Sequence, residues 1–297
     1  MGKIAFLFSG QGTQHTGMGK ELYDSSAAAR AVFEQADAIR PGTSSQCFTA
    51  DTAELSLTSN TQPCMFTVEL AAAAALQEKG IRADMTAGYS LGEVAALTYA
   101  GAVDFKTGFE LVCRRGELMQ RDADAAGSKM AAVVKLSNEE VENICREFRQ
   151  VYPVNYNCPG QLTVAGAADE MKDFAAAVKA AGGRAIPLRV AGGFHSPFMA
   201  RAAADFGEVL ETVDFEDLRI PLYSNFTGSV YEEKPAILLK NQIDHPVRWQ
   251  QIVEEMIRSG ADTFIEAGPG DTLCGFVKKI DGSVKAVNAE EMYQTGD

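Results

Sequence analysis

The sequence feature that most constrains the fold is Gly88-Tyr89-Ser90-Leu91-Gly92, a G-x-S-x-G pattern between a short apolar run and a helical pattern. A serine on such a strand-to-helix turn projects clear of the sheet, and small flanking residues let the two backbones approach closely. The first N–H groups of the helix are unpaired and carry positive potential where an oxyanion would form. The pattern therefore predicts Ser90 as a nucleophile and the N–H of Leu91 as an oxyanion donor. The simpler alternative is a glycine-bracketed turn in which Ser90 only caps the helix.

The first third of the chain alternates between strand and helix patterns. An apolar strand over residues 3–8 ends at Ser9-Gly10-Gln11-Gly12, and a second short strand covers 83–88. We expect an Ala-rich helix that opens at Gln62-Pro63 and closes at Lys79-Gly80, and further helices over 91–99 and 105–121. Alternation of this kind predicts a parallel sheet covered by helices on both faces.

Residues 128–190 follow a different order of elements. We expect strands over 130–134, 151–157, 161–165 and 185–190, and helices over 137–148 and 169–181. The order βαββαβ is that of the ferredoxin-like arrangement. We therefore predict a ferredoxin-like small domain at 128–190, inserted into a large domain made of residues 1–127 and 191–297.

After residue 191 the first pattern resumes. We expect strands over 218–226, 263–266 and 283–288, and helices over 246–259 and 271–280. The formal glycosylation sequon Asn225-Phe226-Thr227 is expected to be unused, because the chain shows no secretory signal.

Composition excludes several classes of protein. Of the 297 residues, 46% are hydrophobic and 23% are charged, which is typical of a globular domain. The longest apolar runs fall well short of the ~18 residues of a membrane span. The net charge of −13 argues against general nucleic-acid binding, so an anionic partner would need a local cationic surface. The six cysteines form no C-x-x-C pair, which favours reduced thiols and a cytoplasmic protein.

A nucleophilic serine needs a base, and the chain offers only His15, His195 and His245. His195 follows a predicted strand within Gly192-Gly193-Phe194-His195-Ser196-Pro197, a loop that can present a side chain into a cleft, and we favour it. The histidine spacings fit no metal site, so we expect no metal. Since no acidic residue stands out as the partner of the imidazole, a backbone carbonyl could orient it instead.

Two further segments each allow two interpretations. Ser9-Gly10-Gln11-Gly12 matches neither a dinucleotide fingerprint nor a phosphate loop, so it is either a tight turn or a loop that brings the Gln11 backbone to Ser90 as a second oxyanion donor. Arg114-Arg115 lies in a helical pattern. It is either a solvated pair, or one arginine turns inward to bind a carboxylate through its planar fork.

Taken together, these motifs resemble the malonyl-CoA:acyl carrier protein transacylases over nearly the whole chain. The order of the motifs carries the resemblance: Phe8-Ser9-Gly10-Gln11-Gly12, Gly88-Tyr89-Ser90-Leu91-Gly92-Glu93, Arg115-Gly116, Asn157-Cys158-Pro159-Gly160-Gln161, Gly193-Phe194-His195-Ser196, Pro246-Val247-Arg248-Trp249 and Glu266-Ala267-Gly268-Pro269-Gly270. The resemblance implies an α/β fold: an α/β-hydrolase-like large domain with a parallel sheet, an inserted ferredoxin-like subdomain, and the active site between them.

The resemblance also implies roles for the catalytic residues. Ser90 would be the nucleophile and His195 its base, with the oxyanion held by the backbone of Gln11 and Leu91. The main-chain carbonyl of Arg248 would orient the histidine.

The same resemblance implies how the substrate is held. Arg115 would bind the malonyl carboxylate, and Phe194, Met119 and Asn157 would complete the substrate-binding set. Phe194 would crowd a 2-methyl branch, so methylmalonyl groups should be poor substrates. The sequence departs from the family at Tyr89, where histidine is common, and at Val94, where an aromatic residue is common, which bears on fine specificity.

The reaction implied is a ping-pong transfer of malonyl from malonyl-CoA to the phosphopantetheine thiol of acyl carrier protein, for fatty acid synthesis. The substrate is malonyl-CoA, and no bound cofactor is expected. The alternatives are an acyltransferase that loads a polyketide synthase, a serine thioesterase or esterase that uses water as acceptor, and a nucleotide-binding module based on the first glycine-rich turn.

The carrier protein of this family is usually acidic, so docking on an acidic chain needs a local basic face. The candidates are Lys278, Lys279 and Lys285 near the C-terminal helix, or Arg184 and Arg189 on the small domain. We expect a monomer that binds neither nucleic acid nor membrane.

Overall fold

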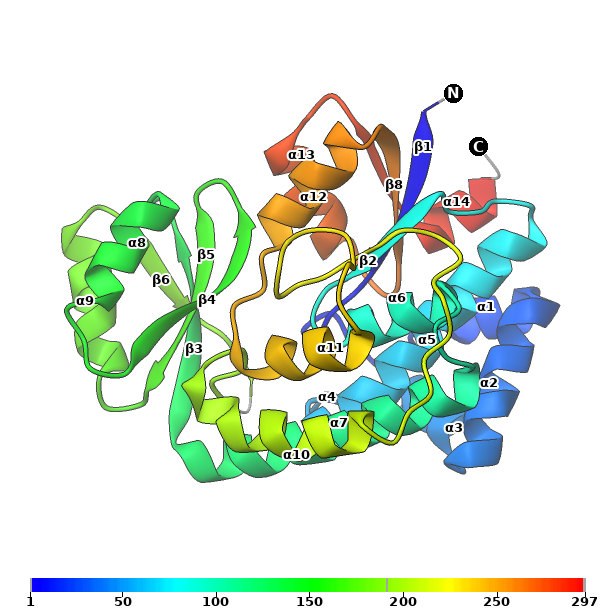
Figure 1. Cartoon of the computed structure of the whole chain (residues 1–297), viewed down its shortest axis with the longest axis horizontal. Coiled ribbons are helices and arrows are strands. Elements are labelled where there is room, and N and C mark those ends of the chain that lie inside the picture. The colour runs from blue at the N-terminus through cyan, green and yellow to red at the C-terminus, as the bar shows by residue number, and fades with distance from the viewer. Residues whose placement is uncertain (1, 191, 296–297) are drawn as a thin grey trace.

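A parallel sheet forms the centre of the large domain in the computed structural model, which describes residues 2–190 and 192–295 (Figure 1). The order of its strands is β7-β2-β1-β8-β9, and every neighbouring pair is parallel. The strands are β1 (Lys3–Phe8), β2 (Met85–Gly88), β7 (Leu222–Tyr223), β8 (Ala261–Ala267) and β9 (Lys285–Asn288). The predicted parallel sheet is therefore confirmed.

Strand β1 contributes buried side chains to both faces of this sheet. Phe6 and Phe8 belong to the core on one face, whereas Ala5 and Leu7 belong to the core on the other, as a period of two residues requires. Phe8 lies opposite Gly88 of β2 and Ala267 of β8. The loops after these strands consequently meet at one edge of the sheet, where α/β proteins bind ligands.

Helices cover both faces, as expected. One face carries the first helices of the chain, namely α1 (Lys20–Ser25), α2 (Ala27–Ile39), α3 (Thr43–Thr49), α4 (Thr52–Leu55), α5 (Thr58–Glu78), α6 (Gly92–Tyr99) and α7 (Phe105–Ala126). The later helical elements are η1 (Pro197–Met199), α10 (Ala200–Leu210), α11 (Pro235–Asp244), α12 (Trp249–Arg258), α13 (Thr272–Ile280) and α14 (Ala289–Thr295). Helices α12 and α13 pack on the Ala5 and Leu7 side of β1.

The sequence patterns missed some of these helices and misplaced the start of another. The patterns did not indicate helices α1 to α4, of which all but the 13-residue α2 are short, or helices α10, α11 and α14. Helix α5 begins at Thr58 rather than at Gln62-Pro63, because Gln120 of α7 accepts the N–H of Thr58 at 2.7 Å. Pro63 therefore lies inside the helix.

The small domain is built on an antiparallel sheet of the order β4-β5-β3-β6. Its strands are β3 (Ser128–Val134), β4 (Val151–Cys158), β5 (Gln161–Ala167) and β6 (Arg184–Pro187), and its helices are α8 (Asn138–Cys145) and α9 (Met171–Ala180). This is the predicted βαββαβ order, and a separate hydrophobic core includes Val133, Leu162 and Phe174. All of these elements lie within the predicted range 128–190. The predicted boundaries at residues 1, 191 and 297 lie outside the described residues.

The segment from Pro246 to Trp249 joins the two domains. The N–H of Val247 donates to the carbonyl of Val154 at 2.8 Å, and its own carbonyl accepts from Tyr156 of β4 at 2.9 Å. Because Val247 is extended against β4, helix α12 begins at Trp249 and not at Pro246 as expected.

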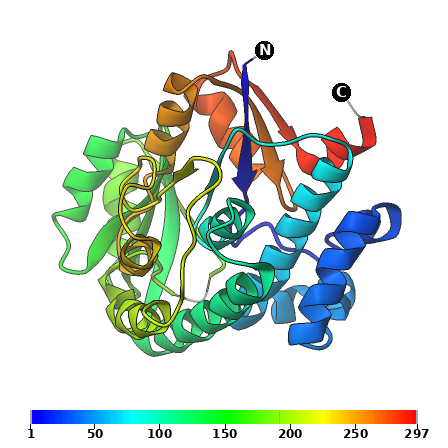
Figure 2. The ribbon, with the colours of Figure 1, turned by 45° about the vertical axis from the view of Figure 1, so that its right-hand side comes forward.

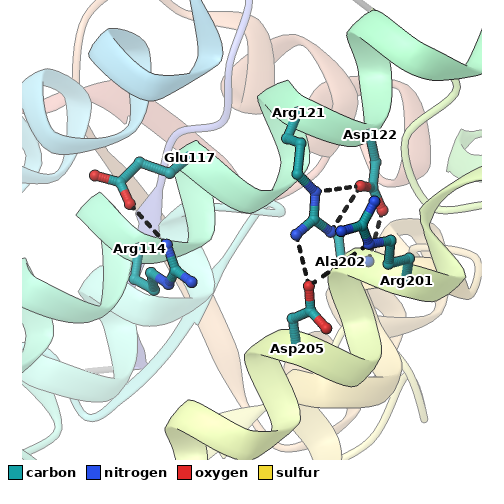
Figure 3. Close-up of polar contacts among 7 residues, drawn as sticks. All are labelled: Arg114, Glu117, Arg121, Asp122, Arg201, Ala202 and Asp205. Atoms are coloured by element: carbon teal, nitrogen blue, oxygen red, sulfur yellow. Dashed lines mark hydrogen bonds and ion pairs between the residues drawn. The ribbon is translucent and has the colours of Figure 1, made fainter.

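An ionic network fastens α10 to α7 (Figure 3). Asp122 of α7 accepts the backbone N–H of Ala202 at 2.7 Å, within the first turn of α10, where the helix N–H groups lack partners. Arg121 bridges from the same region of α7 to Asp205 of α10 at 2.6 Å. Helix α7 and the chain that follows residue 195 are thereby held in register. Within residues 2–190 and 192–295, no helix has the length and apolar character needed to cross a membrane.

The glycines of the G-x-S-x-G turn allow a test of the close backbone approach. A Cβ atom on Gly88 would lie 1.9 Å from the backbone of Gly92, which cannot yield as a side chain would. We expect Gly88→Ala to lower the free energy of unfolding by about 3 kcal/mol.

Gly275→Ala is the matched control. It lies within α13 with open space around its Cβ, so it should raise stability by about 0.5–1 kcal/mol. Urea unfolding of both variants checks the pair, and equal effects would contradict this explanation.

Candidate active site

Ser90 stands on the turn between β2 and α6 with a left-handed backbone, φ 57°. A non-glycine residue rarely adopts this conformation, which persists only where the surroundings enforce it. The surroundings here are close backbones: the N–H of Tyr89 donates to the carbonyl of Phe8 at 2.9 Å, and a Cβ on Gly92 would lie 2.4 Å from that same oxygen. The predicted strand–turn–helix is therefore present, with Ser90 at its apex.

A buried asparagine braces this turn. The side-chain oxygen of Asn225 accepts the N–H of Ser90 at 2.7 Å, and its amide nitrogen donates to the carbonyl of Gly88 at 2.6 Å. Asn225 is fully buried, so the sequon it begins lies inside the fold. The N–H of Ser90 is thus occupied, which leaves the next N–H, that of Leu91, to face an incoming group.

His195 lies against Ser90, as predicted. Its Nε2 is 2.7 Å from Oγ of Ser90, and the side chain is buried. Its backbone is also left-handed, with φ 60°. The predicted serine–histidine pair is therefore formed by two residues that are far apart in the sequence and both held in unusual backbone conformations.

The prediction that the Arg248 carbonyl orients the histidine is wrong. Nδ1 of His195 is 2.7 Å from the backbone carbonyl of Gln242, near the end of α11. Arg248 is held elsewhere: its N–H donates to the carbonyl of Asn225 at 2.9 Å, and its side chain donates to the carbonyl of Phe226. The physical reason is that the neighbouring Val247 pairs with β4, which fixes this segment on the small domain.

Of the two adjacent arginines, Arg115 turns inward. Its side chain is buried, and Nη2 donates to the side-chain oxygen of Gln242 at 2.8 Å and lies 3.3 Å from Oγ of Ser90. Its buried Nε has no partner in the part of the chain that the structure describes. Arg114 is exposed and pairs with Glu117 at 3.1 Å (Figure 3). An unpaired, buried guanidinium nitrogen next to the serine suits a carboxylate ligand.

Gln242 and Glu93 connect the members of the site. The side-chain nitrogen of Gln242 donates to the carbonyl of Ser90 and to Glu93, both at 2.7 Å. Glu93 also accepts from the hydroxyl of Tyr231 at 2.6 Å. Burial raises the pKa of Glu93 to about 7, although hydrogen bonds from Tyr231, Gln242 and Asn225 and the charge of Arg115 oppose the rise. The carboxyl group thus sits close to its titration point near neutral pH.

Burial also shifts the two basic groups toward their neutral forms. Burial and the charge of Arg115 together lower the pKa of His195 to about 3, although the hydrogen bond to the carbonyl of Gln242 opposes the change. Burial lowers the pKa of Arg115 to about 10, whereas the charge of Glu93 opposes this change. His195 is therefore neutral at physiological pH and able to accept the proton of Ser90, while Arg115 stays charged.

A cavity of about 90 Å³ opens onto these groups. Both domains line it. The predicted site residues in its lining are Gln11, Ser90, Leu91, Arg115, Met119, Phe194 and His195. The other lining residues are Gln62, Tyr89, Met130, Asn155, Thr163, Leu188 and Val190. The lining includes the apolar side chains of Met119, Met130, Leu188 and Phe194. A short acyl chain with a terminal carboxylate matches this combination of a narrow apolar wall and a single cation.

Asn157, predicted as a substrate-binding residue, does not line the cavity at Ser90, where Asn155 of the same strand does. The role of Asn157 in substrate binding stays a prediction. Asn157 lines an adjoining cavity of about 200 Å³ that shares Gln11, Tyr89 and Leu188 with the first. There it accepts the hydroxyl of Tyr89 at 2.6 Å. Tyr89, where the sequence departs from the family pattern, is therefore hydrogen-bonded to Asn157.

The backbone near Ser90 offers two free donors. Within residues 2–190 and 192–295, the N–H groups of Gln11 and Leu91 find no protein acceptor. Leu91 precedes the first turn of α6, so its N–H lies at the positive end of the helix. The described residues contain no group of three or more His, Cys, Asp or Glu side chains that could hold a metal ion.

Sequence reasoning missed Gln242, Asn225 and Tyr231, which hold the reacting residues in place. Gln242 lies in a helix that the sequence patterns did not indicate. Asn225 drew attention only as part of a sequon. A polar residue inside a predicted strand was the one signal available for Asn225, because a buried amide there must have partners.

Comparison with known proteins shows what this chain is similar to. The acyl transferase domain family matches residues 5–292. The malonyl CoA-acyl carrier protein transacylase of Bacillus subtilis is 41% identical over 295 residues, which cover 97% of this chain and 93% of that protein. The crystal structure of the malonyl CoA-acyl carrier protein transacylase from Clostridium perfringens superimposes with a TM-score of 0.94 at 35% identity, covering 99% of this chain and 96% of that one.

A solved complex is also similar to this chain. It is described as a type II polyketide synthase acyl-carrier protein in complex with its malonyl-transacylase. The match has a TM-score of 0.94 at 32% identity and covers 99% of this chain and all (100%) of that one.

The pH dependence of Ser90 reactivity tests the state of His195. A sulfonyl fluoride should modify Ser90 at a rate that persists down to about pH 5, because the base stays neutral well below the ordinary histidine pKa of about 6.5. The unfolded chain takes up its proton first as pH falls. The free energy of unfolding therefore carries no penalty from His195 above about pH 6.5, and it falls as the pH drops below that value. Mass spectrometry of the labelled protein measures the rate, with His195→Ala as the unreactive control. An acid limb centred near pH 6.5 would contradict this assignment.

Proposed function

The chain belongs to the acyl transferase domain family, and from this premise we propose that it transfers a malonyl group from malonyl-CoA to the phosphopantetheine thiol of acyl carrier protein. The observation that carries the proposal is the buried Arg115, whose Nη2 lies 3.3 Å from Oγ of Ser90 and whose Nε is unpaired. Full-length relatives that bear this activity in their names support it. Its product would supply malonyl units for fatty acid synthesis.

The first half-reaction loads the enzyme. Oγ of Ser90 attacks the thioester carbon of malonyl-CoA while Nε2 of His195 takes the hydroxyl proton. The N–H groups of Gln11 and Leu91 hold the oxyanion of the tetrahedral intermediate. When the C–S bond breaks, His195 returns the proton to the departing CoA thiol, and malonyl-Ser90 remains.

The second half-reaction unloads it. The carrier's phosphopantetheine thiol loses its proton to His195 and attacks the ester carbon of malonyl-Ser90. The same two N–H groups hold the second oxyanion. The C–O bond then breaks, Ser90 regains its proton from His195, and malonyl leaves on the carrier. The malonyl donor and the acceptor thiol use the same site in turn, so the kinetics are ping-pong.

Arg115 selects the acyl group. Arg115 lines the cavity beside Ser90, where a three-carbon diacid would place its free carboxylate, and its Nε has no partner among the described residues. Phe194 and Met119 line the same cavity and limit the width available for a branched chain. The larger adjoining cavity, which shares Gln11 and Leu188 with the first, offers a path for the pantetheine arm.

A second candidate function is hydrolysis with the same serine, as in an esterase or thioesterase. A hydrolase of simple acyl groups has no need of a buried cation beside its nucleophile, and burying one costs free energy. The polyketide alternative uses the same residues and differs only in the carrier that is served, which a direct comparison of carriers decides.

Trapping the intermediate tests the function. Wild-type protein mixed with malonyl-CoA should gain the mass of one malonyl group on Ser90, and addition of carrier protein should remove it. Ser90→Ala should gain none. Rapid appearance of free malonate in place of carrier acylation would identify a hydrolase, and an adduct on another residue would contradict the mechanism.

Arg115→Ala tests selectivity. Loss of charge-assisted hydrogen bonds to the substrate carboxylate should lower kcat/KM for malonyl-CoA about 100-fold and improve transfer of unbranched acyl groups such as acetyl. The adjacent Arg114→Ala is the matched control and should leave both values unchanged, because Arg114 is exposed and pairs with Glu117. Full malonyl preference in Arg115→Ala would show that another group binds the carboxylate.

A further inference from the structure

The edge strand of the small domain exposes large apolar side chains beside the active site. Ile186 and Leu188 each remain 37% exposed, at the free edge of the β4-β5-β3-β6 sheet. Ile186 lies opposite Ala132, which lies opposite Thr163, and both of those residues line the cavity next to the active site. Leu188 itself lines both cavities. The exposed apolar pair therefore borders the entrance to the site.

Four cations lie at the same edge of the small domain, one of them on the face of the sheet that carries Ile186, two in a groove on the other face and the fourth just after the end of β6. Arg184 lies two residues before Ile186 and on the same face of β6, and Arg189 follows Leu188; both are exposed. Lys129 and Lys172 line a groove of about 310 Å³ between β3, β6 and α9, a groove with no acidic residue in its lining. Across residues 2–190 and 192–295, none of these four forms an ion pair.

This concentration of positive charge runs against the composition of the chain. The net charge is −13, so an acidic partner would be repelled by most of the surface. Four cations with no ion pair among the described residues, next to an exposed apolar pair, place positive charge at this edge of the small domain. Such a combination is typical of a contact that steers an anionic partner electrostatically and then buries a small apolar patch.

We propose that these six residues, Lys129, Lys172, Arg184, Ile186, Leu188 and Arg189, form the docking surface for the acidic carrier protein. The proposal rests on the proposed function. We call these residues the β6 surface.

The basic residues at the other end of the site fit the carrier less well. Lys279 of α13 is engaged with the side chain of Gln161 at 3.0 Å. Helix α13 also contributes none of the large apolar side chains that are exposed in the described part of the chain. Of the two basic faces suggested by the sequence, the one with Arg184 and Arg189 therefore has both the charge and the apolar contact.

Separate measurement of the two half-reactions tests the β6 surface. In the Arg184→Glu/Arg189→Glu double variant, malonyl-Ser90 should form from malonyl-CoA within about twofold of the wild-type rate. Transfer to the carrier should fall about tenfold or more at low salt, and the defect should shrink as salt is added. Ile186→Ser should also slow transfer to the carrier, but with the salt dependence of the wild type.

Lys20→Glu is the matched control. It makes the same kind of charge reversal on α1, which lies on the opposite side of the molecule from the small domain in both views (Figures 1 and 2). It should leave both half-reactions unchanged.

Three outcomes would overturn the docking proposal: unchanged carrier transfer in the Arg184/Arg189 variant, an equal loss in Lys20→Glu, or an equal loss in the first half-reaction, which would mean that the surface binds CoA. Failure of the wild type to form malonyl-Ser90 at all would instead overturn the proposed function. The two failures are therefore distinguishable.

Discussion

One residue, Gln242, connects every reacting group of the site. Its backbone carbonyl accepts from His195, and its side chain contacts the carbonyl of Ser90, Glu93 and Arg115. The carbonyl is available because Gln242 lies in the last turn of α11, where helical carbonyls lack intrahelical partners. This carbonyl orients the imidazole, as an aspartate does in many serine hydrolases, and it places no further negative charge against the histidine.

That choice of partner explains the electrostatics of the pocket. A buried aspartate beside His195 would favour the protonated imidazole and would compete with the substrate carboxylate for Arg115. With a neutral carbonyl in its place, His195 stays neutral and Arg115 keeps a free nitrogen. Glu93, the nearby carboxyl group, has its oxygens occupied by Tyr231, Gln242 and Asn225. The site can therefore hold an anionic acyl group next to a basic histidine.

The sequence could predict the parts of this arrangement that depend on local patterns. The apolar run of β1, the glycine-bracketed Ser90 and the βαββαβ order each follow from short-range periodicity or turn chemistry. The choice between Arg248 and Gln242 depends on whether Val247 pairs with β4, a contact between segments about 90 residues apart. The choice between Asn155 and Asn157 is equally remote from local pattern, because both lie on one strand and two irregularities interrupt its register. What failed was long-range pairing, and with it the identity of the residues that orient the catalytic groups.

The left-handed backbones of Ser90 and His195 have a consequence for handling the protein. Neither conformation is favoured by the residue itself, so each depends on contacts from segments distant in the sequence, such as Asn225 and the carbonyl of Ile243 that accepts the N–H of His195. We expect a mild chaotrope or gentle warming to loosen those contacts and relax the two residues before the surrounding helices unfold. A preparation can then keep its full circular dichroism spectrum and yet be chemically inert, so the reactivity of the serine is the better measure of an intact sample.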